Sequence, residues 1–417
     1  MLKRFLLIFL YLPVFGQVES IKEDVSILCS PTFHGRGYVE NGDEIAANYL
    51  AQRFKQIGLK PLKNSYFQNF RFDVNSFPGS LHFIIDQDTL IPGIDYLIDP
   101  GCPNFNGNLN PKSLSFEICR NQEKLIAEIK QILTQKEFNA VLLDFRTTPK
   151  DSLALIRGIG VEIAQILPVV EWVNQKLTWS VSQEQLNFPL VQLHKDSLKL
   201  QDIRLAIEAK LVKDHESKNV IACIKSKKKK AKTIVFTAHY DHLGRMGKST
   251  YFPGANDNAS GVATLLAMAE KCMKNPIQHY NIVFIAFAGE EVGLLGSKYF
   301  VEHPLMDLKK IQFLINLDIM GSGEDGITVV NATLFNDAFQ ALTQTNADGQ
   351  FLSQIKSRGP AANSDHYWFT QKQVPSFFIY TMGPNKNYHD VHDTYENLTF
   401  AKSNALVELL YQFAAKL

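Results

Sequence analysis

Two apolar, β-branched runs that end in polar residues limit the fold of this chain most strongly. The runs Thr233–Ala238 and Asn281–Ala288 predict buried strands of a parallel sheet. Between them, Ser260–Met273 repeats apolar residues with the period of a helix. Strand, helix and strand in this order form a unit of a wound α/β sheet, which holds its ligands beyond the carboxyl ends of its strands. The sequence therefore predicts a binding site where these two strands end.

Residue types that bind metal ions follow both predicted strands. His239 and Asp241 come after the first strand, Glu290 and Glu291 come after the second, and Asp257 precedes the helix. A Glu-Glu pair by itself is more often a solvated helix start, and a lone histidine is more often a satisfied core residue. Because several such residues stand at neighbouring strand ends, a shared site is the better interpretation.

Two later strands extend the same pattern. Ile311–Leu317 ends in Asp318, and Val374–Tyr380 leads into a loop with Tyr388 and His389. Zinc binds imidazole and carboxylate ligands, and catalytic zinc sites leave one position to water. Three carboxylates and two imidazoles suit two ions about 3.5–4 Å apart, and a further carboxylate can take a proton from water. This inventory predicts hydrolysis of an unactivated amide bond.

Composition and motifs argue against several other classes of protein. The chain has 417 residues, 45% of them hydrophobic, which allows one or two domains. Its 43 basic and 42 acidic residues nearly balance, so nucleic-acid and membrane-surface binding lack support. The basic run Lys227–Lys230 separates two strand-like segments and is typical of a solvated hairpin turn. The sequence has no G-x-S-x-G elbow and no glycine-rich phosphate loop, which argues against serine hydrolysis and nucleotide chemistry.

Residues 1–16 predict a signal peptide. Lys3 and Arg4 precede the apolar run Phe5–Phe15, and Gly16 suits cleavage before Gln17. The apolar run is too short to span a bilayer. We therefore expect an exported protein, periplasmic or secreted, without a membrane span in the mature chain.

Changes in composition divide the rest of the chain into three parts. Residues 17–95 predict the N-terminal part of the site-bearing domain, and residues 216–417 predict its main part. Residues 96–215 predict an inserted α/β domain, because they contain no cluster of ligand types. Cys102 and Cys119 both fall in this inserted part and are the most plausible disulfide pair of an exported protein.

Five motifs together resemble one known family. AHYDHLG, GANDNASGVA, FAGEEVGLLGS, NLDIMG and YHDVHDT are similar, in this order, to the di-zinc aminopeptidase family, which includes bacterial leucyl aminopeptidases. Glutamate carboxypeptidase and glutaminyl cyclase are relatives of that family. The resemblance covers most of Asn219–Leu417 and is weaker over His34–Leu62. It implies the zinc exopeptidase type of fold, a mixed, mostly parallel wound sheet flanked by helices, and the inserted part loosely resembles a protease-associated domain.

The resemblance also implies which residues bind the two zinc ions. His239 and Asp318 would bind one ion, and Glu291 and His389 would bind the other. Asp257 would bridge the two ions.

Three more residues would act beside the ions. Glu290 would be the general base, although spacing alone leaves open which glutamate of the pair has that role. Asp241 would orient the ring of His239, and Tyr388 would donate a hydrogen bond to the developing oxyanion. His392 is the alternative for the last metal ligand, because the residues between the ligand histidine and the following Asp-Thr depart from the family pattern.

The predicted function is zinc-dependent removal of the first residue from peptides with a free N-terminus. A glutaminyl-peptide cyclotransferase would use a similar pocket. A metallocarboxypeptidase would need a cation for the substrate carboxylate, and Arg245 and Arg358 are candidates. A binding protein on the same scaffold would be expected to have lost ligands, and here all six positions are filled. Side-chain preference and oligomeric state are left open by the sequence.

Overall fold

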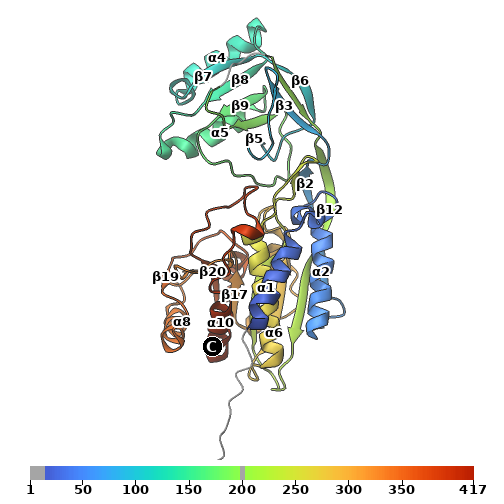
Figure 1. The fold of residues 1–417 in the computed structure, drawn as a ribbon, viewed down its shortest axis with the longest axis vertical. Helices are drawn as coiled ribbons and strands as arrows, with labels where there is room; N and C mark the ends of the chain where they lie inside the picture. Colours follow the sequence, from blue (N-terminus) through green and yellow to red (C-terminus); the bar gives the residue numbers. More distant parts are fainter. Residues whose placement is uncertain (1–14, 198–201) are drawn as a thin grey trace, which may run out of the picture.

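The computed structural model describes residues 15–197 and 202–417, arranged as two bodies stacked along the long axis (Figure 1). The predicted signal peptide lies outside the described residues except for its last two positions, so export stays a prediction. Within the described ranges, no helix is both long and apolar enough to cross a membrane.

The lower body in Figure 1 is built on a mixed sheet. Across the sheet the strands are β1 (Lys60–Pro61), β12 (Lys210–Ile224), β16 (Asn281–Phe287), β13 (Thr233–His239), β17 (Ile311–Leu317), β20 (Ser376–Thr381), β18 (Ile327–Val330) and β19 (Ile355–Ser357). The central strands β16, β13, β17 and β20 are parallel neighbours, whereas β12 and β18 flank them in antiparallel orientation. The predicted α/β fold with a mixed, mostly parallel sheet is therefore confirmed.

Helices cover both faces of this sheet, which explains why its central strands are apolar throughout. Ile234 and Phe236 of β13 pack on one face, and Val235 packs on the other. The first face carries α1 (Phe15–Leu28), α2 (Gly42–Ile57), α6 (Gly261–Lys274), α8 (Asn336–Gly349) and α10 (Ser403–Lys416). The second face carries α7 (Leu295–Glu302) and α9 (His366–Gln371).

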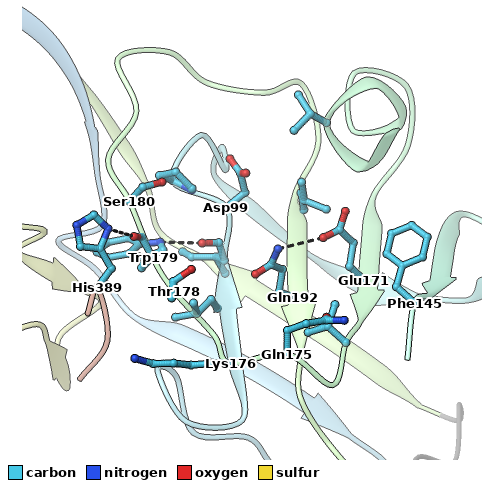
Figure 2. A pocket seen from close by; sticks show the side chains of 16 residues that line it. Asp99, Phe145, Glu171, Gln175, Lys176, Thr178, Trp179, Ser180, Gln192 and His389 are labelled. Carbon is cyan, nitrogen blue, oxygen red and sulfur yellow. Dashed lines mark hydrogen bonds between the residues drawn. The ribbon is translucent and has the colours of Figure 1, made fainter. Parts of the chain in front are cut away.

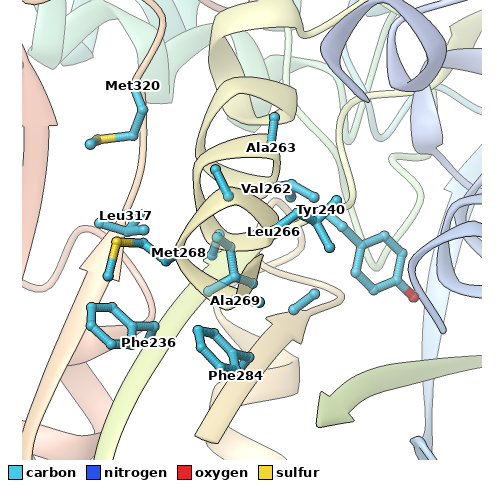
Figure 3. Close-up of a cluster of buried hydrophobic side chains, with 14 of the residues drawn as sticks. Phe236, Tyr240, Val262, Ala263, Leu266, Met268, Ala269, Phe284, Leu317 and Met320 are labelled. Carbon is cyan, nitrogen blue, oxygen red and sulfur yellow. The ribbon is translucent and has the colours of Figure 1, made fainter. Parts of the chain in front are cut away.

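The core under α6 is centred on two stacked phenylalanines (Figure 3). Phe236 of β13 and Phe284 of β16 are in register, and their rings lie 5.7 Å apart at an interplanar angle of 14°. Leu266 and Met268 of α6 are fully buried in the same cluster. This packing fixes α6, and with it the loop that precedes α6, against the two strands that end at the predicted site.

The interpretation of Lys227–Lys230 as a hairpin turn is wrong. The lysines are exposed and connect β12 to β13, but those two strands do not pair, because β16 lies between them and pairs with both. The physical reason is burial. β13 is apolar on both faces and takes a central position, whereas β12 begins with an exposed half that pairs with β2 (Phe67–Ser76).

The upper body in Figure 1 has its own core, which is formed by residues between Phe77 and Ala209 and is joined by Leu243, Met246 and Phe252 of the lower body. Its larger sheet consists of β5 (Tyr96–Ile98), β10 (Leu190–Leu193), β9 (Val169–Trp172), β8 (Ala140–Asp144) and β7 (Pro111–Ser115). Its smaller sheet consists of β4 (Asp88–Thr89), β3 (Leu81–Ile85), β11 (Ile203–Ile207) and β6 (Phe105–Leu109). The core starts earlier than the expected boundary between residues 95 and 96, because β3 pairs with β11. We call this body the inserted domain; its protease-associated type remains a prediction.

The predicted disulfide between Cys102 and Cys119 is not formed. All five cysteines of the chain are free and buried. The Cys102 sulfur accepts a hydrogen bond from the backbone amide of Leu190 in β10, whereas Cys119 ends the short helix α3 (Phe116–Cys119). Each sulfur is thus buried without a bond to the other, which the shared location of the two residues in one segment could not reveal.

Replacing Phe284 by alanine should destabilise the site-bearing body. The substitution removes a fully buried ring from a stacked pair, and such losses cost about 3–5 kcal/mol. The urea midpoint followed by circular dichroism measures this loss. Leu334→Ala is the control, because Leu334 is 49% exposed and its loss should cost less than about 0.5 kcal/mol. Equal midpoints for the two variants would contradict the assignment of this core.

Candidate metal centre

The five predicted metal ligands lie together beyond the carboxyl ends of the parallel strands. His239 ends β13, Asp318 follows β17, and Glu291 lies just after β16. Asp257 lies in the loop before α6, and His389 lies in the loop after β20. Their side chains are only 1–15% exposed. The strand ends therefore bring together residues that are far apart along the chain.

Asp257 stands between two groups of ligand atoms. Its Oδ1 lies 3.3 Å from His239 Nε2, and its Oδ2 lies 3.1 Å from His389 Nε2. Asp318 Oδ1 lies 3.5 Å from His239 Nε2, which completes the first group. Glu291 Oε2 lies 3.2 Å from His389 Nε2, which completes the second. The structure thus forms two sets of an imidazole and a carboxylate that share Asp257.

These distances fit metal coordination. Ligand atoms about 2.0–2.1 Å from one zinc ion in tetrahedral geometry lie roughly 3.3–3.5 Å from one another. Asp318 Oδ1 is buried and accepts no hydrogen bond from any described residue, so a cation would satisfy it. Burying several carboxylates without counter-charge is costly. The residues present therefore fit one divalent cation in each set.

Both ligand histidines are turned so that Nε2 faces the carboxylates. His239 Nδ1 lies 3.2 Å from the backbone carbonyl oxygen of Asp241, and His389 Nδ1 lies 2.9 Å from that of Trp179. A proton on Nδ1 that is donated to a carbonyl leaves the Nε2 lone pair for a metal ion. This arrangement is the one that a neutral imidazole ligand requires.

Asp241 lies at the site, but its carboxylate does not hold the His239 ring. The nearest carboxylate oxygen is 3.9 Å from His239 Nδ1, and the backbone carbonyl of Asp241 makes the shorter contact. The carboxylate instead accepts hydrogen bonds from the backbone amides of Glu290 and Glu291, each at 3.2 Å, and from the Tyr38 hydroxyl at 2.8 Å. Asp241 thereby ties the end of β13 to the acidic pair after β16.

The two glutamates of the acidic pair have different surroundings. Glu291 contacts His389 through Oε2 and His242 Nδ1 through Oε1, the latter at 2.7 Å. Glu290 lines the open cavity beside the metal ligands. Burial raises the pKa of the Glu290 carboxyl well above its usual value; His239 opposes this rise, and nearby carboxylates such as Glu291 add to it. The sequence left the roles of the pair open, and the two side chains differ in these contacts.

A cavity of about 230 Å³ opens onto the site. Tyr388 lines it, is 47% exposed, and stacks on His389 with ring centroids 3.9 Å apart. Arg358 also lines it and donates a hydrogen bond to the Tyr380 hydroxyl at 3.4 Å. Arg245 lies outside this cavity, with its guanidinium 3.0 Å from His34 Nδ1. His392 is the alternative last ligand. The contacts with Asp257 and Glu291 given above are made by His389 and not by His392.

Arg36 stands in none of the five site motifs, although it positions the loops of the site. The side chain is fully buried, and its guanidinium donates five hydrogen bonds to backbone carbonyls. The acceptors are the carbonyl oxygens of Leu28, Tyr240, Pro253, Gly254 and Asp257. All five donors of a guanidinium are thus used, which makes its burial tolerable. The signal was HGRG, whose Gly37 lies so close to Gly244 that a Cβ would clash at 2.3 Å.

Asp393 is a second residue whose role the sequence did not reveal. Its carboxylate accepts hydrogen bonds from the backbone amides of Asn256 and Asp257, at 2.9–3.1 Å. Burial raises the pKa of Asp393 to about 7, and those two hydrogen bonds oppose the rise. Asn256 in turn accepts a hydrogen bond from the amide of Gly321, which lies in the loop of Asp318. The loops that carry Asp257, Asp318 and His389 therefore form one hydrogen-bonded unit.

The inserted domain contacts the metal centre directly. The Trp179 carbonyl contacts the His389 ring, as Figure 2 shows. The Trp179 amide also donates a hydrogen bond to the backbone carbonyl of His389 at 2.8 Å. Lys176 forms an ion pair with Asp390. The Trp179 ring stacks on Phe252 of the lower body, with centroids 4.7 Å apart. The orientation of His389 thus depends on residues of the inserted domain.

Comparison with known sequences supports the resemblance drawn from the motifs. Residues 219–414 match the family model described as Peptidase family M28. Aminopeptidase YwaD of Bacillus subtilis (strain 168) is 32% identical over 213 residues, which are 46% of this chain and 45% of YwaD. A protein of Arthroderma otae named "Probable leucine aminopeptidase" is 29% identical over 199 residues, which are 45% of this chain and 55% of that protein. The chain spans about half the length of the curated relatives it matches.

Comparison with solved structures extends the similarity of fold to nearly the whole chain. BSAP, a zinc aminopeptidase from Bacillus subtilis, has a TM-score of 0.69 at 19% identity and covers 95% of this chain and 94% of its own. The aminopeptidase from Aneurinibacillus sp. strain AM-1 has a TM-score of 0.63 at 18% identity, with 95% and 93% covered. At these identities the likeness concerns the fold. The motifs at the strand ends and the family match agree that residues 219–414, just under half of the chain, are similar to peptidase family M28.

Proposed function

We propose that this protein is a metallo-aminopeptidase that binds two zinc ions and removes the first residue of peptides with a free N-terminus. The observation that carries the proposal is Asp257, which presents one carboxylate oxygen to His239 and the other to His389. A carboxylate shared in this way is the arrangement that two adjacent cations require. The names of the family and of the relatives, which include aminopeptidases, support the same reaction.

The residues of the chain divide the chemical work among them. Bound zinc ions would polarise the scissile carbonyl and lower the pKa of the attacking water. Glu290 takes the proton of that water and passes it to the leaving amine, as a general base and then a general acid. Tyr388, on the cavity wall, donates to the oxygen that gains negative charge.

A metallocarboxypeptidase is the second candidate, because one observation favours it. Arg358 lines the metal cavity, and a guanidinium there could bind the carboxylate of a substrate. The two candidates differ in which end of the peptide must be free.

Glu290→Gln should abolish turnover and leave metal binding intact. The amide cannot accept the proton of the water, and loss of a general base costs about 10²–10⁴-fold in kcat. The measurements are kcat on leucyl-nitroanilide and zinc content by atomic emission. Glu302→Gln, at an exposed glutamate of α7, is the matched control and should keep full activity. A variant without zinc would show that Glu290 is a ligand instead.

Asp257→Ala should lose both metal ions and should unfold at a lower temperature than the parent. The substitution removes the shared ligand, and metal that binds only the folded state stabilises it. Zinc content and calorimetry of the holoprotein report the two effects. If this variant retained two zinc ions per chain, the bridging role would be wrong.

A substrate panel with and without a chelator tests the reaction itself. Leucyl-nitroanilide should be cleaved, and its N-acetylated form should not, because the free amine is required. A glutaminyl peptide separates cyclisation from hydrolysis. A chelator should abolish all cleavage, and added zinc should restore it. Cleavage of an N-blocked peptide from its free carboxyl end would favour the carboxypeptidase instead.

A further inference from the structure

A second cavity, of about 390 Å³, lies in the inserted domain next to the metal centre (Figure 2). We call it the insert groove; its lining includes Asp99, Phe145, Glu171, Thr178, Gln192 and His389. One wall is the larger sheet of the inserted domain, and the opposite wall is the segment 173–180 that follows β9. His389 lines both the insert groove and the metal cavity. The two cavities are therefore neighbours that share a metal ligand as a wall.

The insert groove crosses several strands. Asp99 follows β5, Gln192 lies in β10, Glu171 lies in β9, and Phe145 follows β8. Because these strands are neighbours in this order, the groove extends over three strand spacings, or roughly 14 Å. An extended peptide advances about 3.3 Å per residue, so about four residues fit along it.

The polar lining suits the main chain of a peptide. Gln175 offers an amide donor and acceptor, and Thr178 and Ser180 offer hydroxyl groups. Gln192 donates a hydrogen bond to Glu171 at 3.1 Å and still offers its side-chain carbonyl oxygen. Apolar residues such as Val173 lie between them. A few polar groups on an apolar surface are typical of sites that bind and orient a ligand.

Asp99 gives the insert groove a negative charge near its His389 end. One oxygen of Asp99 accepts a hydrogen bond from the Gly101 amide at 2.7 Å, and none of the ion pairs between described residues includes Asp99. Burial raises the pKa of the Asp99 carboxyl, a rise that a bound cation would reverse. Lys176, which also lines the groove, is already paired with Asp390. A lysine or arginine of a ligand would therefore find a carboxylate without a competing partner.

We propose that the insert groove binds the part of the peptide substrate that follows the cleaved bond, and that Asp99 favours a lysine or arginine in that part. The inference rests on the proposed function, because only a peptide held at the metal centre by its first residue would continue into the neighbouring cavity. It assigns the substrate class as peptides of about five or more residues, since about four residues fill the groove. The inserted domain is then a part of the substrate-binding surface.

The first test is a series of leucyl peptides, all amidated, that are lengthened one glycine at a time from Leu-Gly-amide. The zinc-loaded full chain should show kcat/KM rising by about tenfold along the series, which corresponds to 1.4 kcal/mol of added binding, and then reaching a plateau. A value that does not change with length would overturn the inference.

Thr178→Trp should remove most of this gain, because a bulky ring at this exposed position on the groove wall would fill the space of the peptide. The matched control is Asn174→Trp, at an exposed residue of the same segment that does not line the groove. The quantity compared is the ratio of kcat/KM for the longest and shortest peptides, and zinc content is measured for both variants. If the ratio is as high for Thr178→Trp as it is for Asn174→Trp, the inference is also overturned.

The role of Asp99 is tested by moving a lysine along the peptide. The best lysine position should exceed norleucine at the same position by about threefold in kcat/KM, and Asp99→Asn should abolish this preference. Asp151→Asn, at an exposed carboxylate of the inserted domain outside the groove, should keep it. A lysine preference that survives in Asp99→Asn would contradict the assignment.

A binding measurement separates failure of this inference from failure of the proposed function. An N-acetylated, amidated lysine-containing hexapeptide has no free terminus to be cleaved, and calorimetry should show that it binds the parent more tightly than Thr178→Trp. If that difference is found and leucyl-nitroanilide is not cleaved, the groove stands and the aminopeptidase proposal fails. If leucyl-nitroanilide is cleaved and the difference is absent, the groove assignment fails alone.

Discussion

The contact of one carboxylate with two histidines is the constraint on which the rest of the structure depends. Asp257 must place Oδ1 beside His239 and Oδ2 beside His389 at the same time, and all three side chains are largely buried. A carboxylate that faces two imidazole nitrogens in a buried site needs positive charge between them, because buried charges are costly when unpaired. The fold must therefore hold the Asp257 loop rigidly between a strand end and a distant loop.

That rigidity comes from polar groups that carry no chemistry of their own. Arg36 donates hydrogen bonds to five backbone carbonyls of the surrounding segments. The Asp393 carboxylate accepts hydrogen bonds from the backbone amides of Asn256 and Asp257. Asp241 connects β13 to the acidic pair after β16 through the amides of that pair. Each of these groups is buried with several of its hydrogen bonds satisfied, so each restricts the loops to one arrangement.

The inserted domain contributes to the same arrangement from outside the sheet. Its Trp179 carbonyl faces His389 Nδ1, which sets the direction of Nε2 on the other side of the ring. The groove beside Trp179 shares His389 with the metal cavity. The orientation of the His389 ring and the shape of the groove are thus linked through one residue.

The sequence by itself determined the parallel strands, the helix between them and the identity of the clustered ligand types, because burial periodicity and the polar residues at strand ends are local properties of the chain. It also established the resemblance to the peptidase family that the comparisons confirm. Only the tertiary structure decided that β16 lies between β12 and β13, that Cys102 and Cys119 are both free, and that a carbonyl of the inserted domain faces His389. The role of Arg36 belongs to this second group. These features depend on which distant segments meet when the loops close, and no local pattern of residues encodes that meeting.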